Sequence, residues 1–378
     1  MKFSRMSHEA RLAWLGSQII ETPDVKRVNT LCDRLHRQTR TKNEGNGGFI
    51  LGETGSGKST AVAAFTDDLY SRLAAKRPNS EWHRPESIDT PILPIFEIQA
   101  DSGWIRHVVV IVVPPRPRFN SFLRSVAATL GVQLRNHFDF GEAIDQIKTQ
   151  IALQKVSMMI FDEAQHFVEG TIDSYQAADV IKIIMKCRVQ AICIGLPNML
   201  NLVEGEKANE QLLRLRQKQV EVTPLKCSLD DFVGSDGTAR KKGDPRFADT
   251  PFTKFCEALD ARDEPEKIIL PFDQSSAISS PFFALRLWRA GGGRVGKVME
   301  LLFQATDLAI EKGMPKLTLP ILEAVCRQNG INDQDNWFKM EVPEFLRRFE
   351  GDKRVGNKNE ADGAQRSRYP ANPLRKKR

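Results

Sequence analysis

Residues 52–60, GETGSGKST, constrain the fold of this chain more than any other stretch. They fit the pattern G-x-x-x-x-G-K-[ST], with a strand-like GFIL before them and a helical TAVAAFTDDLYSRL after them. A glycine-rich loop in that setting turns backbone N–H groups and a helix N-terminus toward phosphate groups. An ordinary glycine-rich turn is the alternative, but the strand before it and the helix after it favour a phosphate site.

This stretch, the phosphate loop, predicts ATP and Mg²⁺ as cofactors. Lys58 is expected to reach the β- and γ-phosphates, and the Ser59 hydroxyl to bind Mg²⁺. The residues predicted to bind the nucleotide here are Gly52, Glu53, Thr54, Gly55, Ser56, Gly57, Lys58, Ser59 and Thr60.

Residues 158–167, MMIFDEAQHF, place two neighbouring carboxylates after an apolar run. A buried charge is unfavourable unless it is paired or holds a metal ion. In a phosphate-loop ATPase, an acid at the end of a neighbouring strand serves Mg²⁺, which predicts this role for Asp162. Glu163 is expected to act as general base on the attacking water. The alternative is that both acids only cap a helix.

Strand-like runs alternate with helical patterns as far as residue 225, which predicts an α/β fold with a doubly wound, mostly parallel, five-stranded sheet. Beyond about residue 250 only helical periodicity remains, which predicts a small helical lid domain. The expected organisation is an N-terminal helical segment (1–44, two helices broken at ETPD), an α/β core (45–230), a polar basic loop (231–250), the lid (251–335) and a C-terminal segment (336–378).

Composition argues against several classes of protein, including membrane proteins, secreted proteins and zinc-binding proteins. No run of 18 apolar residues exists and the N-terminus lacks a signal-peptide pattern, so we expect a cytoplasmic protein without a membrane partner. The six cysteines are scattered without a CxxC pair, which favours reduced thiols over a zinc site. Net charge is +7, and residues 351–378 hold nine Lys or Arg against three Asp or Glu, which predicts a disordered basic tail.

Further candidates follow the central strands. Asn198, past the strand-like ICIG, is a candidate sensor of the γ-phosphate, or it only starts a helix. Arg216, ahead of Arg214, is a candidate to reach a neighbouring subunit's γ-phosphate, or both lie on a solvated helix face. Arg294 and Lys297, in GGGRVGKVMELL, are candidate nucleotide contacts from the lid.

The order of loop, acid pair, strand-end polar residue, arginine and helical lid resembles the AAA+ ATPases. Within them, four stretches are similar to the TniB/TnsC regulators of transposition: HEARLAWLGSQIIETPDVKRVNTLCDRL, VVPPRPRFNSFLRSVAATLGV, IFDEAQHF and GGGRVGKVMELLFQATDLAI. Leu196 stands where that family usually carries Thr. The resemblance covers roughly residues 7–330.

The resemblance implies an AAA+ P-loop NTPase fold and an ATP-dependent, DNA-binding regulator. Such a protein forms a homo-oligomer, a ring or helical filament with hexamer-like or heptamer-like geometry, on duplex DNA. It marks a target and recruits or activates a DDE transposase, and in CRISPR-associated relatives it links a target-selection protein to that transposase. ATP is expected to promote assembly and hydrolysis to release it.

DNA contact is predicted where exposed cations can face phosphates. The candidates are Arg116 and Arg118 in PPRPRF, a second loop with Arg240, Lys241 and Lys242, and the tail; solvated loop charge is the alternative for each. Two other functions stay open. A helicase-loader or initiator ATPase would carry a replication contact or a winged helix, and a DNA-independent signalling ATPase an effector domain.

Overall fold

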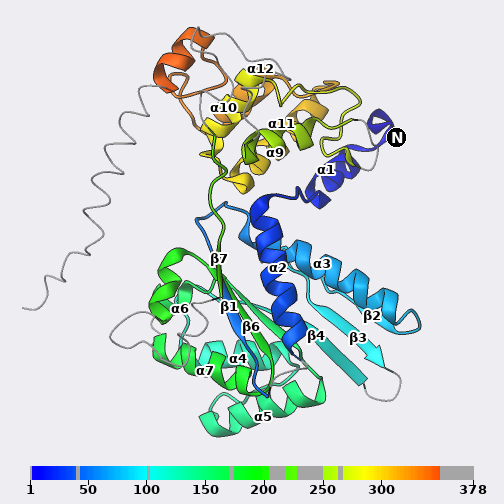
Figure 1. Cartoon of the computed structure of the whole chain (residues 1–378), viewed down its shortest axis with the longest axis vertical. Coiled ribbons are helices and arrows are strands. Elements are labelled where there is room, and N and C mark those ends of the chain that lie inside the picture. The colour runs from blue at the N-terminus through cyan, green and yellow to red at the C-terminus, as the bar shows by residue number, and fades with distance from the viewer. Residues whose placement is uncertain are drawn as a thin grey trace, which may run out of the picture. The chain divides into compact units, whose positions relative to one another are not determined.

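The computed structural model describes residues 2–39, 43–99, 103–169, 174–203, 218–227, 250–262 and 267–349. The chain divides into two compact units (Figure 1). The sheet unit comprises Ile19–Pro224 and Arg294–Lys297. The helical unit comprises Met1–Gln18, Leu225–Gly293 and Val298–Arg378. Each unit has its own core and is described by itself.

The sheet unit alternates strands and helices along the chain. Its elements are α2 (Pro23–Gln38), β1 (Gly47–Leu51), α3 (Lys58–Lys76), β2 (Glu81–His83), β3 (Ile95–Gln99), β4 (Gly103–Val112), α4 (Phe119–Thr129), α5 (Phe140–Leu153), β5 (Met158–Asp162), α6 (His166–Glu169), α7 (Ser174–Lys186), β6 (Gln190–Gly195), η2 (Pro197–Leu202) and β7 (Gln219–Glu221).

The sheet has seven strands among the described residues, in the order β2-β3-β4-β5-β6-β1-β7. The five strands from β4 to β7 are parallel, whereas β2 and β3 pair antiparallel at the β4 edge. The predicted α/β fold with a mostly parallel sheet is confirmed, but the predicted count of five covers only the parallel part. The three-residue β2 is too short to give a hydrophobic pattern.

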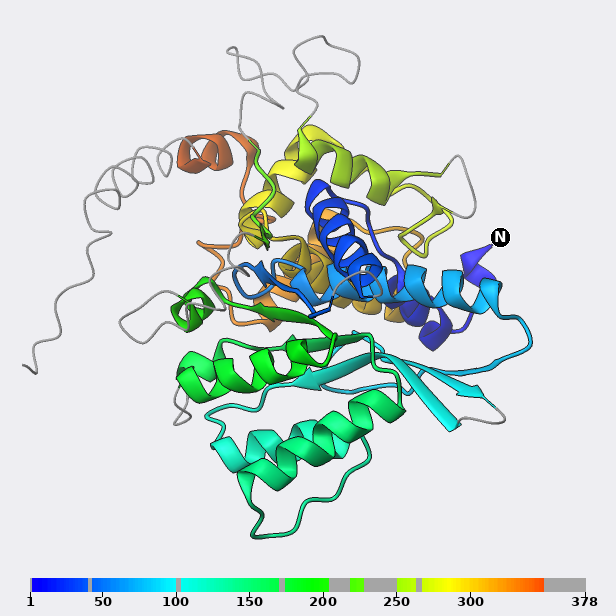
Figure 2. The ribbon, with the colours of Figure 1, turned by 60° about the horizontal axis from the view of Figure 1, so that its bottom comes forward.

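Helices cover both faces of this sheet, and the period-2 alternation of side chains decides which residues meet which layer (Figure 2). Phe49, Met159 and Phe161 pack with α4, α5 and α7. Ile50 and Ile160 pack with α2 and α3 on the other face. Because both faces are buried, the central strands are continuously apolar instead of alternating with polar residues.

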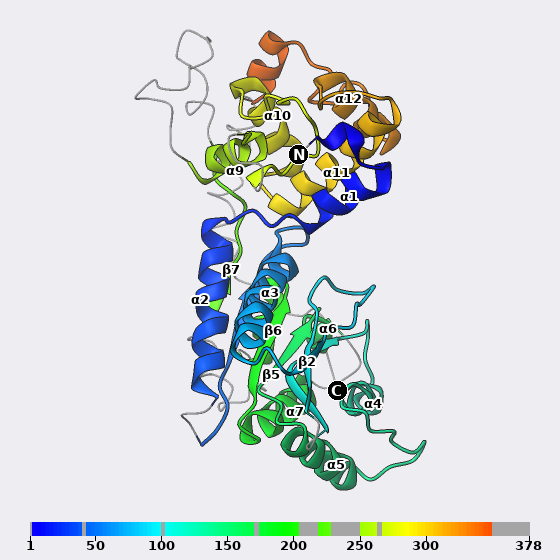
Figure 3. The same cartoon turned by 90° about the vertical axis from the view of Figure 1, so that its right-hand side faces the viewer.

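The carboxyl ends of β1, β5 and β6 meet at one edge of the sheet. Leu51 pairs with Gly195 across β1 and β6, and Phe161 pairs with Cys193 across β5 and β6. The phosphate loop leaves β1 at this edge and enters α3, which lies against the sheet beside α2 (Figure 3). Register therefore brings the loop, Asp162 and the residues after Gly195 together.

The helical unit holds the all-helical part of the chain. Its elements are η1 (Phe3–Arg5), α1 (His8–Ser17), α9 (Pro251–Asp260), α10 (Pro281–Gly291), the part of α11 (Val295–Glu311) from Val298 on, and α12 (Leu319–Gln328). Phe252, Phe255 and Leu302 are among its fully buried residues. The buried Arg286 is satisfied by the carbonyl oxygens of Trp337 and Met340, at 3.0 and 2.6 Å.

The two N-terminal helices belong to different units. As the ETPD stretch predicts, α1 ends at Ser17 and α2 begins at Pro23, where the Thr22 hydroxyl caps the first turn. Trp14 donates from its indole to the Ile268 carbonyl at 3.0 Å, and the Phe3 N–H donates to Asp273 at 2.7 Å. Residues 1–18 thus pack with chain some 250 residues away in sequence, and only α2 joins the sheet.

Several predicted site residues lie outside the described ranges. They are Arg214 and Arg216, the basic loop residues Arg240, Lys241 and Lys242, and the basic tail from residue 350 onward. Within the described ranges, none of the helices combines the length and apolar character needed to cross a membrane.

Candidate nucleotide site

The phosphate loop has the backbone that its glycines predict. Gly55 and Gly57 have φ of 75° and 94°, in the left-handed region that other residues rarely adopt, and Gly57 is the N-cap of α3. A Cβ on Gly52 would lie 2.6 Å from the Val222 carbonyl oxygen and 2.8 Å from Ser56 Oγ. The sequence pattern therefore meets both conformational and packing demands of the loop.

The side chain of Lys58 folds back onto the backbone of this loop. Its ammonium donates to the carbonyl oxygens of Gly52 at 2.7 Å and Glu53 at 2.9 Å. Burial lowers the pKa of Lys58, and the nearby charges of Glu163, Asp162 and Glu53 oppose that shift. The first residue of α3 thus provides a cation at a helix N-terminus, where an anion is favoured.

Asp162 is the centre of a hydroxyl and amide cluster. It is 4% exposed and accepts from Ser59 Oγ at 3.2 Å, from Thr90 Oγ1 at 2.7 Å and from the Glu163 N–H at 3.0 Å. Burial raises the pKa of Asp162, and these three hydrogen bonds act against the shift. The two residues predicted to serve Mg²⁺, Ser59 and Asp162, thus lie within hydrogen-bond distance of each other. Thr90 was not predicted, because nothing in its neighbouring sequence points to a residue 72 positions away.

Glu163 is held by a side chain that the sequence pattern did not single out. Its φ of 55° is unusual for a residue other than glycine. The buried Gln165 donates its side-chain amide to the Glu163 carboxylate and accepts from the Leu196 N–H at 3.3 Å. A Cβ on Gly195 would lie 2.6 Å from Gln165 Oε1, so the last residue of β6 leaves room for this link.

Asn198 follows β6 in the short helix η2. Its side-chain amide donates to Glu169 at 2.6 Å, while its Oδ1 is buried and has no hydrogen-bond partner among the described residues. This candidate sensor is therefore hydrogen-bonded to α6, the short helix that follows Asp162 and Glu163 in the chain. Its contact with a γ-phosphate stays a prediction.

Residues 294–297 group with the sheet unit and touch the phosphate loop. Arg294 forms an ion pair with Glu53 at 2.9 Å, and the Lys297 N–H donates to the Gly55 carbonyl at 3.2 Å. A Cβ on Gly55 would lie 2.8 Å from Lys297 Cγ. Both candidate contacts from this segment therefore lie at the loop.

Arg116 and Arg118 occupy the loop between β4 and α4, after the carboxyl end of a parallel strand. Both are exposed, and within the described ranges neither guanidinium has a carboxylate partner. Arg116 has φ 50°, and the backbone of Arg118 caps α4 through Ser121. Within the described part of the chain, no carboxylate competes with an external anion for these two cations.

The residues at this site fit ATP and Mg²⁺. Ser56 Oγ is buried without a hydrogen-bond partner in the described part of the chain, beside the backbone of a phosphate-binding loop. Ser59 and Asp162 supply the hydroxyl and carboxylate oxygens that Mg²⁺ prefers when nucleotide phosphates complete its shell. Among the described residues, no group of three His, Cys, Asp or Glu gathers as a metal site.

Comparison with known proteins agrees with this geometry. Residues 41–203 match the family model described as an AAA domain. The segment covers the phosphate loop, Asp162, Glu163 and Asn198. With the 7-stranded sheet, it identifies the AAA+ P-loop NTPase fold and supports ATP hydrolysis by this chain. No curated protein was found to match the sequence.

Solved structures with partial similarity to this chain were also found. They include the Orc1 protein of Aeropyrum pernix in complex with DNA (14% identity, 84% of this chain and 69% of that chain, TM-score 0.47). Cdc6p of Pyrobaculum aerophilum has 11% identity over 84% and 70% of the two chains, with a TM-score of 0.49. Drosophila ORC bound to DNA has 11% identity over 88% and 69%, with a TM-score of 0.49. At these values none of them assigns a function to this chain.

Proposed function

We propose that this protein is an ATP-dependent, DNA-binding regulator of transposition. It assembles as a homo-oligomer on duplex DNA, marks the target site and recruits or activates a DDE transposase. The observation that carries the ATP-dependent part is the contact of Ser59, on the phosphate loop, with Asp162, directly before Glu163. The similarity of four stretches of sequence to the TniB/TnsC regulators supports the transposition part.

The proposed hydrolytic roles use residues that the structure brings close together. Glu163, oriented by Gln165, accepts a proton from the attacking water. Lys58 and the N–H groups of the loop hold the phosphates, and Ser59 with Asp162 holds Mg²⁺. Bound Mg²⁺ would neutralise charge that develops on the phosphates. Arg216, with Arg214 as the second candidate, is proposed to act on the γ-phosphate of a neighbouring subunit.

The proposed DNA contact rests on Arg116 and Arg118. Guanidinium groups suit phosphate oxygens, and neither of these is neutralised by a carboxylate of the described chain. A few such contacts in each subunit add up in an oligomer, and each neutralised phosphate steepens the salt dependence of binding. Arg240, Lys241 and Lys242 remain a second proposed contact.

An initiator or helicase-loader ATPase is the second candidate function. The same nucleotide site and the same exposed Arg116 and Arg118 serve a DNA-bound replication ATPase equally well. The two functions differ in the partner, which is an integrase-type transposase in one and a replication protein in the other. A pull-down of each partner class by the ATP-bound protein on DNA distinguishes them.

The test is to measure duplex-DNA binding and particle size with ATP, ADP and no nucleotide. Wild type is compared with Glu163→Gln, and with Glu142→Gln as a control at an exposed carboxylate on α5. ATP should drive large assemblies on DNA, and those of Glu163→Gln should persist longer. If ATP is hydrolysed while DNA changes neither size nor rate, the transposition proposal fails and a DNA-independent signalling ATPase is favoured.

A further inference from the structure

A cavity of about 690 Å³ lies in the sheet unit, away from the nucleotide site. It is formed at the other end of the sheet, since Lys155 and Ser157 directly precede β5, whereas Asp162 ends that strand. The helix α2 contributes its last turn, and α3 contributes its last two turns. The lining residues are His36, Arg37, Thr39, Leu69, Arg72, Leu73, Lys76, Arg77, Ile105, His107, Lys155 and Ser157.

The lining is strongly cationic. It includes the five cations Arg37, Arg72, Lys76, Arg77 and Lys155 and no Asp or Glu. The ion pairs that these five make use three carboxylates, from Asp33, Asp68 and Glu97. Lys76 and Lys155 have no carboxylate partner in the described ranges. Among the described residues, the five cations therefore outnumber the carboxylates paired with them by two.

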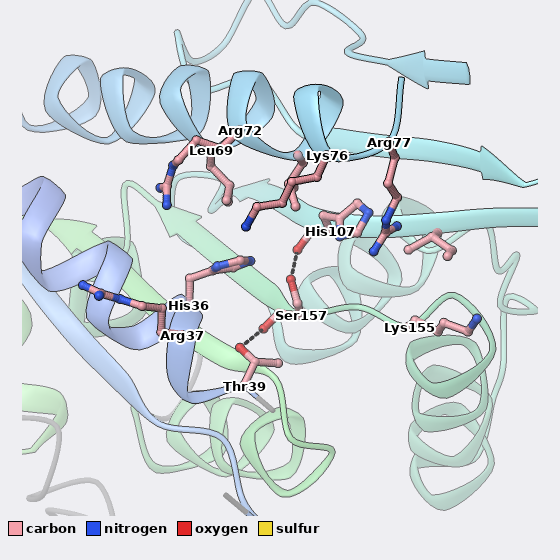
Figure 4. Close-up of a pocket in the computed structure, with 12 residues that line it drawn as sticks. His36, Arg37, Thr39, Leu69, Arg72, Lys76, Arg77, His107, Lys155 and Ser157 are labelled. Carbon is pink, nitrogen blue, oxygen red and sulfur yellow. Dashed lines mark hydrogen bonds between the residues drawn. The ribbon is translucent and has the colours of Figure 1, made fainter. Parts of the chain in front are cut away.

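Lys76 is the central cation of this group. Figure 4 shows Lys76 and His36 extending toward each other from α3 and α2, with Arg77 beside His107 and Lys155 at the margin. Cations are also favoured at the C-terminus of a helix for electrostatic reasons. That effect favours Lys76, in the last turn of α3, and also Lys155, which directly follows the C-cap of α5 in a left-handed conformation with φ 50°. It does not by itself direct both side chains into one cavity.

The floor of the cavity is fixed and partly apolar. His107 is 7% exposed, and its Nε2 forms a hydrogen bond with the Glu97 carboxylate at 2.8 Å. Its ring stacks on Trp82, with ring centroids 5.5 Å apart. Ser157 donates to the His107 carbonyl, and Thr39 donates to the Ser157 carbonyl at 3.4 Å. Leu69, Leu73 and Ile105 complete the wall. A concave, partly apolar space of this volume suits a small molecule, whereas duplex DNA presents a convex surface.

We propose that this cavity binds a small phosphorylated ligand of nucleotide size, with its phosphates on Lys76 and the neighbouring arginines. Arginine and lysine are the residues that recognise phosphate groups. The site is separate from the phosphate loop, and it does not depend on the proposed role in transposition. Both β5 and α3 run from this cavity to the nucleotide site, so the ligand is placed to regulate ATP hydrolysis.

The test uses inorganic pyrophosphate titrated calorimetrically into full-length protein that is already saturated with ADP, so that the phosphate loop is filled. Lys76→Gln/Lys155→Gln removes the two cations without leaving a carboxylate unpaired. Lys186→Gln/Lys316→Gln, at exposed positions outside the cavity, is the matched control. Pyrophosphate should bind wild type and control alike. The cavity variant should lose about tenfold or more in affinity, as expected for lost charge-assisted hydrogen bonds.

Unchanged basal ATP hydrolysis in the cavity variant shows that it has folded. Equal pyrophosphate affinity in both double variants would overturn the proposal. The proposal would also be overturned if pyrophosphate only displaced ADP from the phosphate loop and bound at no second site. A short duplex DNA is titrated in parallel: if only DNA binding falls in the cavity variant, the cations contact a nucleic-acid backbone and the small-ligand site is excluded.

Discussion

The side-chain amide of Gln165 donates a hydrogen bond to the carboxylate of Glu163, two residues before it. The orientation of this amide is fixed, because the Leu196 N–H is only a donor and requires the Gln165 carbonyl oxygen on its side, at 3.3 Å. The proposed general base, directly after β5, is thereby connected to the backbone directly after β6, near the candidate sensor Asn198.

Replacing Gln165 should lower turnover and leave ATP affinity nearly intact. In Gln165→Ala the Glu163 carboxylate loses its orienting partner, and misplacement of a catalytic group by about 1 Å can lower the rate on the order of 100-fold. We expect kcat to fall about 10- to 100-fold, with little change in KM for ATP, in steady-state assays. Gln146→Ala, at a half-buried glutamine on α5 that bonds Glu142, is the control. A rise in KM without a fall in kcat would contradict the positioning role.

Gly195→Ala should reproduce that defect from the opposite side of the contact. The new methyl group would lie 2.6 Å from Gln165 Oε1 and 2.9 Å from the Gln165 N atom, so the link to Glu163 must shift. Overpacking of this kind typically destabilises by about 1–3 kcal/mol. Because both changes disturb one contact, the loss in kcat of Gly195→Ala/Gln165→Ala should be smaller than the product of the single losses. Fully multiplicative losses would show that the two residues act separately.

Asp162 should make the nucleotide-free protein less stable as pH rises. Burial raises the pKa of this carboxyl in the folded state, whereas in the unfolded chain it is about 3.9. Between these two values the folded state holds more protons, so the free energy of unfolding falls with rising pH. The melting temperature of Asp162→Asn minus that of wild type should therefore increase from about pH 4 to about pH 7. A constant or shrinking difference would contradict the pKa shift.

The ion pair between Arg294 and Glu53 should matter for nucleotide affinity more than for stability. Both side chains are partly exposed, at 26% and 64%, and such pairs contribute about 0.2–1 kcal/mol or less. Arg294→Gln should change the melting temperature little but raise KM for ATP severalfold, because a cation beside the phosphates is lost. Arg327→Gln, which breaks exposed ion pairs in the helical unit, is the comparison. An equal KM in both variants would exclude Arg294 from the nucleotide site.

The parts of the site that lie close together in sequence could be predicted. The glycines of the phosphate loop and the acids at the end of β5 are each contained in one short pattern, and the parallel sheet brings them together by register. Thr90 and Gln165 could not be predicted, because their partners depend on where a loop before β3 and the end of β6 come to lie. The grouping of residues 1–18 with the helical unit is likewise a matter of contacts distant in sequence.

The helix α3 begins at Lys58 in the phosphate loop and ends at Lys76 in the cationic cavity, a span of 19 residues. At 1.5 Å per residue, its two ends are about 27 Å apart. Charges at such a distance are screened from one another, since the Debye length is about 8 Å at physiological ionic strength. Filling one end with anions therefore leaves the electrostatic potential at the other almost unchanged. Any dependence of ATP turnover on the cavity would have to be transmitted mechanically, and it should survive high salt wherever the cavity itself remains occupied.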